Sequence, residues 1–301
     1  MAEIVESVPN ISEGRREDVI ARIVNRAADG KEMLIFDVKP DADHNRTVIT
    51  MFGTRVGVRD AIYRLFDATI PEIDLRNHKG EHKRMGAVDV VPFIPIRGVT
   101  MEDCVALSKE VAEEIGRRYQ IPVYLYERSA SDPERENLAN IRKGEFEGFG
   151  EKIKLPQWKP DFGPAEVHPS AGCVAVGGRQ VLIAFNVNLA TADLGAAEMI
   201  AKQIRFIGGG LRYCKAAGIA LQERGIVQIS MNLTDYTKTP IWMAYELIKA
   251  MAEKQGINVI GCELIGMAPA AALYDVANYF LNIEGFRYEQ VFEVALAEKG
   301  M

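Results

Sequence analysis

The sequence predicts an α+β protein made of two ferredoxin-like subdomains, each with the element order β-α-β-β-α-β. Both halves of the 301-residue chain alternate apolar runs typical of strands with 3.6-residue apolar patterns typical of helices. A segment rich in glycine and proline separates the halves. We place the boundary near Gly177-Gly178, which gives subdomains 1–177 and 178–301. A ligand cleft is expected between the two.

The first half begins with a strand over residues 4–8 that ends in the turn Pro9-Asn10. A helix follows Ser12-Glu13-Gly14, because apolar residues recur there at helical spacing, and Gly30 ends it. A second helix is expected through residues 56–66. Apolar and β-branched runs predict the other strands of this half at residues 33–38, 47–52, 87–96 and 123–126.

Two further helices of this half carry capping signals. Thr100-Met101-Glu102-Asp103 supplies a capping hydroxyl followed by acids in the first turn. Asp132-Pro133 places a capping residue before a proline, which predicts a short helix over residues 133–143. From there to residue 178 we expect a long irregular segment, and such segments are usually functional loops or linkers.

The second half repeats the same order of elements. We expect strands over residues 181–188, around Ile219, over 227–233 and over 259–264, and helices over 192–204 and 240–254. Val8–Ile11 precedes the first helix of one half as Val187–Ala190 precedes its counterpart in the other. This correspondence indicates a duplicated unit.

Composition restricts the class of protein. The chain has 36 Lys+Arg against 42 Asp+Glu, a net charge of −6, and 48% hydrophobic residues, which excludes disordered and fibrous proteins. A mildly acidic chain lacks the general basic surface that nucleic-acid binding needs, so we expect no nucleic-acid partner. No run reaches the roughly 18 apolar residues of a membrane span. Glu3 and Glu6 stand where a secretory signal would be positive, so we expect a cytoplasmic protein.

The segment Arg76–Gly86 is the clearest candidate for chemistry, because it is polar and holds two of the four histidines. His78-Lys79-Gly80-Glu81-His82 matches H-x-x-E-H, in which two imidazoles one helical turn apart bind zinc. That interpretation needs a helix, which Gly80 disfavours. A second interpretation is a loop that recognises an acidic substrate and supplies an imidazole as acid and base. A solvated surface loop is the third.

Other parts of the sequence give weaker signals. His44 lies in an acid-rich turn, and His168 lies in Gly163–Gly172, whose glycines suit either close approach to a flat heterocycle or a rigid linker. The four cysteines form no C-x-x-C pair, which argues against a zinc ribbon or a disulfide framework. Gly208-Gly209-Gly210 does not continue as G-x-G-x-x-G, and no P-loop or G-x-S-x-G motif is present.

Seven separated motifs follow one another along nearly the whole chain: Val8–Gly14, Asn45–Val48, His78–His82 with Arg84–Val90, Pro92–Pro95, Pro122–Tyr126, Trp158–Pro164 and Leu182–Asn188. Together they resemble the glutamate formimidoyltransferase family, the formiminotransferase domain of the formiminotransferase-cyclodeaminases. In animals this unit is joined to a cyclodeaminase, whereas this chain resembles the stand-alone form.

The resemblance implies transfer of the formimino group from N-formimino-L-glutamate to N5 of tetrahydrofolate, giving 5-formiminotetrahydrofolate and L-glutamate in histidine degradation. It implies His82 as the general acid and base, tetrahydrofolate as co-substrate, no metal, a homodimer, and a separate cyclodeaminase as a further partner. Gly163–Gly172 corresponds to the folate-binding segment of the family. The residues expected to bind glutamate or folate are Asn10, Asp37, Arg46, His78, Lys79, Arg84, Gly163, Pro164, Val167, His168 and Gly172.

One position departs from the family. The strand after the first helix usually ends Asp-x-Asp, whereas here Asp37 is followed by Lys39. A catalytic imidazole is usually oriented by a carboxylate, so we expect Asp37, Asp41 or Asp43 to take that role. Two alternatives stay open: a relative that uses a formyl donor or 5-formyltetrahydrofolate, and a folate-binding protein without catalysis.

Overall fold

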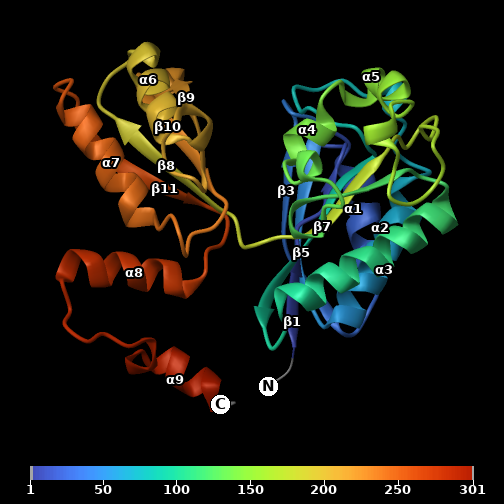
Figure 1. Cartoon of the computed structure of the whole chain (residues 1–301), viewed down its shortest axis with the longest axis horizontal. Coiled ribbons are helices and arrows are strands. Elements are labelled where there is room, and N and C mark those ends of the chain that lie inside the picture. The colour runs from blue at the N-terminus through green and yellow to red at the C-terminus, as the bar shows by residue number, and fades with distance from the viewer. Residues whose placement is uncertain (1–2, 300–301) are drawn as a thin grey trace. The chain divides into compact units, whose positions relative to one another are not determined.

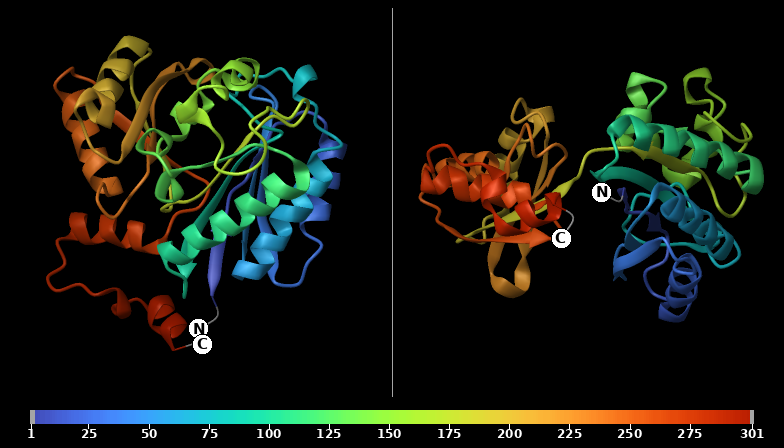
Figure 2. Two further views of the ribbon diagram at one scale, coloured as in Figure 1. Left: turned by 45° about the vertical axis from the view of Figure 1, so that its right-hand side comes forward. Right: turned by 90° about the horizontal axis from the view of Figure 1, so that it is seen from below.

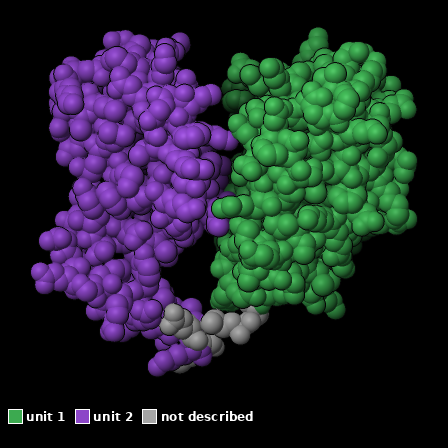
Figure 3. Space-filling view, viewed as in Figure 1, with its two compact units in different colours: residues 1–179 green, residues 180–301 purple. Residues whose placement is uncertain are grey.

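The computed structural model describes residues 3–299 and divides the chain into two α+β units, as predicted (Figures 1 and 3). Unit 1 comprises residues 1–179 and unit 2 comprises residues 180–301. Gly177 and Gly178, where we expected the boundary, both belong to a strand of unit 1. None of the helices over residues 3–299 combines the length and the apolar character that a membrane span requires. The ligand cleft between the units stays a prediction.

Unit 1 is built on a seven-stranded sheet in the described part of the chain. Its strands are β1 (Ile4–Ser7), β2 (Asn10–Ile11), β3 (Met33–Asp41), β4 (Arg46–Gly53), β5 (Val88–Arg97), β6 (Val123–Leu125) and β7 (Val174–Gly178). β3 pairs with β4, and both β1 and β2 lie between β4 and β5. These pairs are antiparallel, whereas β5, β7 and β6 form a parallel edge.

Three helices cover one face of this sheet and lie side by side (Figure 2). They are α1 (Glu17–Ala27), α2 (Arg55–Thr69) and α3 (Met101–Tyr119). Each buries one apolar stripe against the strands, as the 3.6-residue pattern predicts. The capping prediction for Thr100 is confirmed, because its hydroxyl accepts the Asp103 amide at 3.1 Å and the Asp103 carboxylate accepts the Thr100 amide at 3.0 Å.

The parallel edge of the sheet is buried on both faces. Val123 and Leu125 of β6 face the three helices, whereas Tyr124 faces a second core formed with α4 (Leu138–Arg142) and α5 (Glu145–Lys152). This part of the chain differs from our expectation. The predicted helix over residues 133–143 is a 3-10 turn followed by α4, and the supposedly irregular segment contains α5 and β7.

Unit 2 has a four-stranded antiparallel sheet in the order β11-β8-β10-β9. Its elements are β8 (Ile183–Leu189), α6 (Leu194–Ile204), β9 (Cys214–Leu221), β10 (Ile226–Leu233), α7 (Ile241–Glu253) and β11 (Val259–Ile265). Each pair of strands joined through a helix therefore has one antiparallel strand between its members. Two helices that we did not expect, α8 (Ala270–Leu281) and α9 (Phe292–Glu298), follow this sheet (Figure 1).

The stability of unit 1 should be sensitive to shortening of a buried side chain on β5, the central strand of its sheet. Phe93 is 0% exposed in the core, so Phe93→Ala should lower the free energy of unfolding by about 3 to 5 kcal/mol. Phe36→Ala is the matched control, because that ring is 64% exposed, and its cost should be about 1 kcal/mol or less. Urea denaturation of the two variants measures the difference, and equal losses would contradict the assignment of Phe93 to the core.

Candidate active site

His82 lies in the loop between the 3-10 turn Leu75–Asn77 and β5. Residues 78–86 form no helix, so the two imidazoles of the H-x-x-E-H pattern are not held one helical turn apart, and the zinc interpretation loses its geometric basis. Over residues 3–299 no group of three or more His, Cys, Asp or Glu side chains is arranged to hold a metal. The ring of His82 is 7% exposed, and its Nε2 atom lies 3.5 Å from Oδ2 of Asp89.

Asp89 is the buried carboxylate beside this histidine. Its Oδ1 atom accepts the backbone amides of Met85 and Gly86, at 2.7 and 3.3 Å. Its Oδ2 atom accepts Nε and Nη2 of Arg142, at 2.8 and 2.5 Å. Burial alone would raise the pKa of Asp89, but Arg142, His82 and the Met85 amide together hold it at about 2. Asp89 is therefore ionised throughout the neutral range.

This arrangement corrects the expected carboxylate partner of His82. Asp41 contacts the ring of His44 at 2.8 Å, and Asp37 forms an ion pair with Lys39 at 3.1 Å on β3. Asp43 approaches the loop that carries His82 through its backbone carbonyl, which accepts the Glu81 amide at 3.2 Å. The carboxylate that the structure places against His82 belongs to Asp89, on a different strand.

His78 and Arg84 form a second, internally satisfied pair. Nε2 of His78 donates to the carbonyl of Asn45 at 2.7 Å, and Nδ1 accepts Nε of Arg84 at 3.0 Å. Burial lowers the pKa of His78, which favours the neutral ring that these two bonds require. The Arg84 guanidinium is 7% exposed and also binds Glu147, at 2.6 and 2.9 Å. It does not offer a free cation to a substrate carboxylate, contrary to our expectation.

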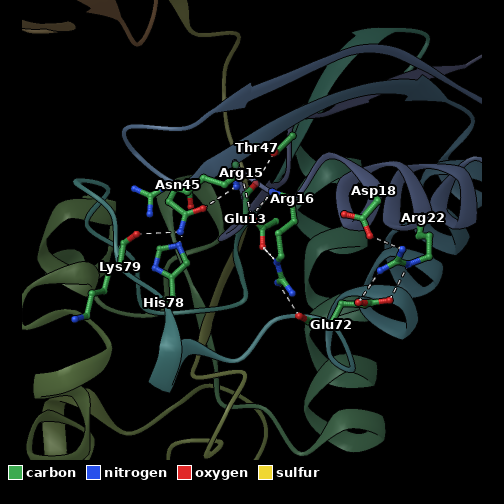
Figure 4. Close-up of polar contacts among 11 residues, drawn as sticks. Glu13, Arg15, Arg16, Asp18, Arg22, Asn45, Thr47, Glu72, His78 and Lys79 are labelled. Carbon is green, nitrogen blue, oxygen red and sulfur yellow. Dashed lines mark hydrogen bonds and ion pairs between the residues drawn. The ribbon is translucent and has the colours of Figure 1, made fainter.

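Asn45 joins three loops beside His78 (Figure 4). Its side chain accepts the Gly14 amide at 2.9 Å and donates to the Lys79 carbonyl at 2.9 Å, while its own carbonyl accepts His78. Asn45 has a left-handed backbone, with φ of 49°, which asparagine tolerates better than most residues. Residues 78–86, which we call the histidine loop, are thus fixed to the turn before α1.

Two cavities adjoin the histidine loop within unit 1. One of about 470 Å³ is lined by His78, Lys79, Gly80, Arg84, Gly144, Glu145 and Glu147. The other, of about 310 Å³, is lined by Ser12, Glu13, Arg15, Arg16, Asn45, Glu72, Ile73, Asp74, Asn77 and His78. Lys79 is exposed, so its ammonium group is the clearest expected carboxylate contact at the larger cavity.

Two further expected binding residues lie on the strands near this loop. Arg46 of β4 is partly buried, and its Nε atom has no hydrogen-bond partner among the described residues. Burial lowers the pKa of Arg46, while the neighbouring carboxylates of Asp41 and Asp89 raise it. Asn10 of β2 donates its side-chain amide to the Val8 carbonyl at 3.2 Å, so it is engaged within its own turn.

Backbone hydrogen bonds join the histidine loop to the end of the expected folate segment and the residue after it. Ala87 donates its amide to Ala171, and Cys173 donates to Met85, at 2.9 and 2.8 Å. Gly172 has φ of 70°, and a Cβ atom there would overlap the Met85 carbonyl oxygen. The other predicted members of this segment have these surroundings: Gly163 packs against α3, Val167 packs against the second core, Pro164 is half-buried, and Nδ1 of His168 accepts the Ala171 amide at 3.0 Å.

Sequence reasoning did not single out Asp89, Arg142 or Asn45, which the structure places around His82 and His78. Asp89 is a lone acid in an apolar strand pattern, directly after the polar segment Arg76–Gly86. An acid buried in such a strand needs a nearby cation, and this is the signal that could have found it. Arg142 is separated from it by 53 residues, and no sequence pattern relates the two.

Comparison with known proteins gives a consistent result along the whole chain. The N-terminal subdomain model of the formiminotransferase domain matches residues 4–179, and the formiminotransferase domain model matches residues 184–300. Glutamate formimidoyltransferase of Streptococcus pyogenes serotype M1 is 48% identical over 294 residues, which cover 97% of this chain and 98% of that protein. The protein of the same name from Thermoplasma acidophilum is 43% identical and covers 96% of both chains.

Formimidoyltransferase-cyclodeaminase of Rattus norvegicus is 38% identical over 290 residues. The alignment covers 94% of this chain, which spans about half, 53%, of that longer protein. This chain therefore belongs to the formiminotransferase family.

The close packing at Gly172 predicts a position-specific loss of stability. Gly172→Ala should cost about 3 kcal/mol or more, because the methyl group adds overlap with Met85 to the strain of a left-handed backbone. Gly256→Ala is the matched control: its φ is 69°, but no described atom lies within 4 Å of the added carbon, so it should cost about 1 to 2 kcal/mol. Equal losses in urea denaturation would contradict the close packing of Gly172 against Met85.

The depressed pKa of Asp89 predicts a dependence of stability on acid. Its pKa of about 2 lies below the ordinary value of 3.8, so ionised Asp89 stabilises the fold above about pH 4, and this contribution disappears as the pH falls towards 2. At pH 7 this contribution should make the free energy of unfolding of the wild type about 2 kcal/mol larger than that of Asp89→Asn. The free energy of unfolding, measured from pH 7 to pH 2, should show the two proteins converging. A constant difference would refute the ionised, buried carboxylate.

Proposed function

We propose that this chain is a glutamate formimidoyltransferase, which transfers the formimino group of N-formimino-L-glutamate to N5 of tetrahydrofolate. The observation that carries the proposal is the near-complete alignment with the Streptococcus pyogenes protein of that name, 48% identical over 97% of this chain. The buried pair of His82 and Asp89 supports it, because the reaction needs one group that both accepts and donates a proton.

In the first step N5 of tetrahydrofolate attacks the amidine carbon of the donor. The new N5–C bond forms while the electron pair of the C=N bond moves to nitrogen, and the proton of N5 passes to His82. The Nε2 atom of His82 faces Asp89, which leaves Nδ1 as the ring nitrogen for the reacting groups. Ionised Asp89 stabilises the imidazolium formed in this step.

In the second step the tetrahedral intermediate collapses. The bond between the former amidine carbon and the glutamate nitrogen breaks, the C=N bond forms again, and His82 gives its proton to the departing amine. One proton has then moved from N5 to glutamate, so the reaction needs no external acid, base or oxidant. Proton transfer by one positioned side chain typically increases the rate by a factor of about 10² to 10⁴.

Recognition of the substrates follows from their carboxylates and from the heterocycle of folate. We assign the exposed ammonium of Lys79 and the partly buried guanidinium of Arg46 to carboxylate contacts. The segment Gly163–Gly172 is the proposed folate-binding segment. A homodimer, a separate cyclodeaminase partner and a cytoplasmic location remain predictions from the family resemblance.

The test is turnover of tetrahydrofolate with N-formimino-L-glutamate, run beside N-formyl-L-glutamate and followed after conversion of the product to methenyltetrahydrofolate by acid. The wild type should use the formimino donor. His82→Asn should lower kcat by a factor of about 10² to 10⁴ while folate binding persists. His44→Asn is the matched control, because that ring is 43% exposed and pairs with Asp41, and it should retain turnover.

The other outcomes identify the alternatives. Turnover with the formyl donor alone would replace the proposed donor. Folate binding without turnover of either donor would establish a non-catalytic folate-binding protein and refute the mechanism.

A further inference from the structure

Arg142 and His82 meet at the same oxygen atom of Asp89. Both Nε and Nη2 of Arg142 donate to Oδ2, at 2.8 and 2.5 Å, and Nε2 of His82 lies 3.5 Å from that oxygen. Nη2 of Arg142 therefore lies within about 6 Å of the imidazole. The guanidinium side chain is 19% exposed and the Asp89 side chain 0%, so solvent screens this group of charges weakly.

The distance on the histidine side is longer than a hydrogen bond. An N–H···O bond usually spans about 2.7 to 3.2 Å, and Nε2 of His82 is buried without a hydrogen-bond partner among the described residues. The two donors of Arg142 and the two backbone amides occupy both oxygens of Asp89. His82 thus faces a carboxylate whose charge is already largely engaged.

We propose that Arg142 sets the pH range in which His82 exchanges protons, by offsetting the charge of Asp89, and this inference rests on the function proposed above. An imidazole that accepts a proton from N5 must be neutral when the substrate arrives. A buried carboxylate without a counterion would favour the protonated ring and remove that base at neutral pH. Arg142 is in this sense a positioning residue that acts through Asp89.

Other charged groups around His82 limit the size of the effect. Arg46 of β4 interacts with Asp41 of β3, with Asp89 of β5 and with Arg142 of α4. His78 of the same loop interacts with His82 and is itself bound to Arg84. A second cation therefore remains near Asp89 when Arg142 is removed, and we expect a shift of about one pH unit for a charge at this distance.

The backbone that carries Arg142 is itself fixed. Arg142 is the last residue of α4, where carbonyl groups lack helical partners. Nζ of Lys152 donates to the carbonyls of Asn140, Ile141 and Lys143, at 2.6, 2.6 and 3.1 Å, and lies 3.9 Å from the centre of the Trp158 ring. This cap holds the end of the helix from which Arg142 reaches Asp89.

The experiment titrates His82 directly in the full chain. Protein labelled with ¹³C at histidine Cε1 is followed by NMR from pH 5 to 9, and His82→Asn assigns the signal. Arg142→Met should raise the midpoint of His82 by about one unit, and Arg142→Lys, which keeps the charge, should stay near the wild type. The acid limb of kcat/KM, measured on the same variants, should move with the midpoint.

A double-variant cycle guards against a misfolded single variant. Asp89→Asn should lower the midpoint, and Asp89→Asn with Arg142→Met should bring it back up, so this pair measures the Arg142 charge even if Arg142→Met alone does not fold. The two uncharged side chains replace a buried ion pair, which proteins often tolerate. Arg135→Met is the matched control, because Arg135 forms a buried pair with Asp161 instead, and it should leave the midpoint in place.

An unchanged His82 midpoint in folded Arg142→Met, or an equal shift in Arg142→Lys, would overturn the inference. The NMR titration needs no substrate, so it distinguishes this failure from failure of the proposed reaction. Absence of turnover in the wild type, together with the expected shift of the His82 midpoint in Arg142→Met, would refute the proposed function and keep the role of Arg142.

Discussion

The arrangement of the candidate active site depends on the fully buried carboxylate of Asp89. An ion removed from water is costly unless hydrogen bonds and an opposite charge replace its hydration. Here the replacements come from two segments: the amides of Met85 and Gly86 in the histidine loop, and the guanidinium of Arg142 at the end of α4. Strand β5, the loop and α4 therefore stabilise one another through a single side chain.

The histidine loop has little regular structure, so its backbone groups need partners from elsewhere. The segment before β7 supplies them, since Ala171 and Cys173 bond to both sides of Gly86. Glycines at positions 86 and 172 allow this close backbone approach, because a side chain at Gly86 would overlap the Cys173 carbonyl and one at Gly172 would overlap the Met85 carbonyl. A segment that could have been a linker in the sequence thus supplies the backbone partners of the histidine loop.

Regular periodicity explains which parts of the fold could be predicted. The amphipathic helices α1, α3, α6 and α7 and the strands β8 and β10 follow from apolar spacing. β7 escaped prediction because both of its faces are buried and its small residues sit among glycines, so no alternation marks it. α8 escaped because, of its twelve residues, Ala272 alone is buried. Composition singled out the segment Arg76–Gly86, and the family resemblance then pointed to His82 within it. Asp89 and Arg142 come together only through the folded chain.

The position of Asp89 also explains how His82 has a carboxylate neighbour although residue 39 is a lysine. The side chain of Lys39 is 52% exposed on β3 and pairs with Asp37, so a carboxylate placed there would be screened by water. Asp89 lies on β5 with a side chain 0% exposed, where the interaction with an imidazole 3.5 Å away is stronger for the same charge. A charge buried in the sheet does not depend on the exposed edge strand, so loss of an acid at position 39 leaves the carboxylate beside His82 in place.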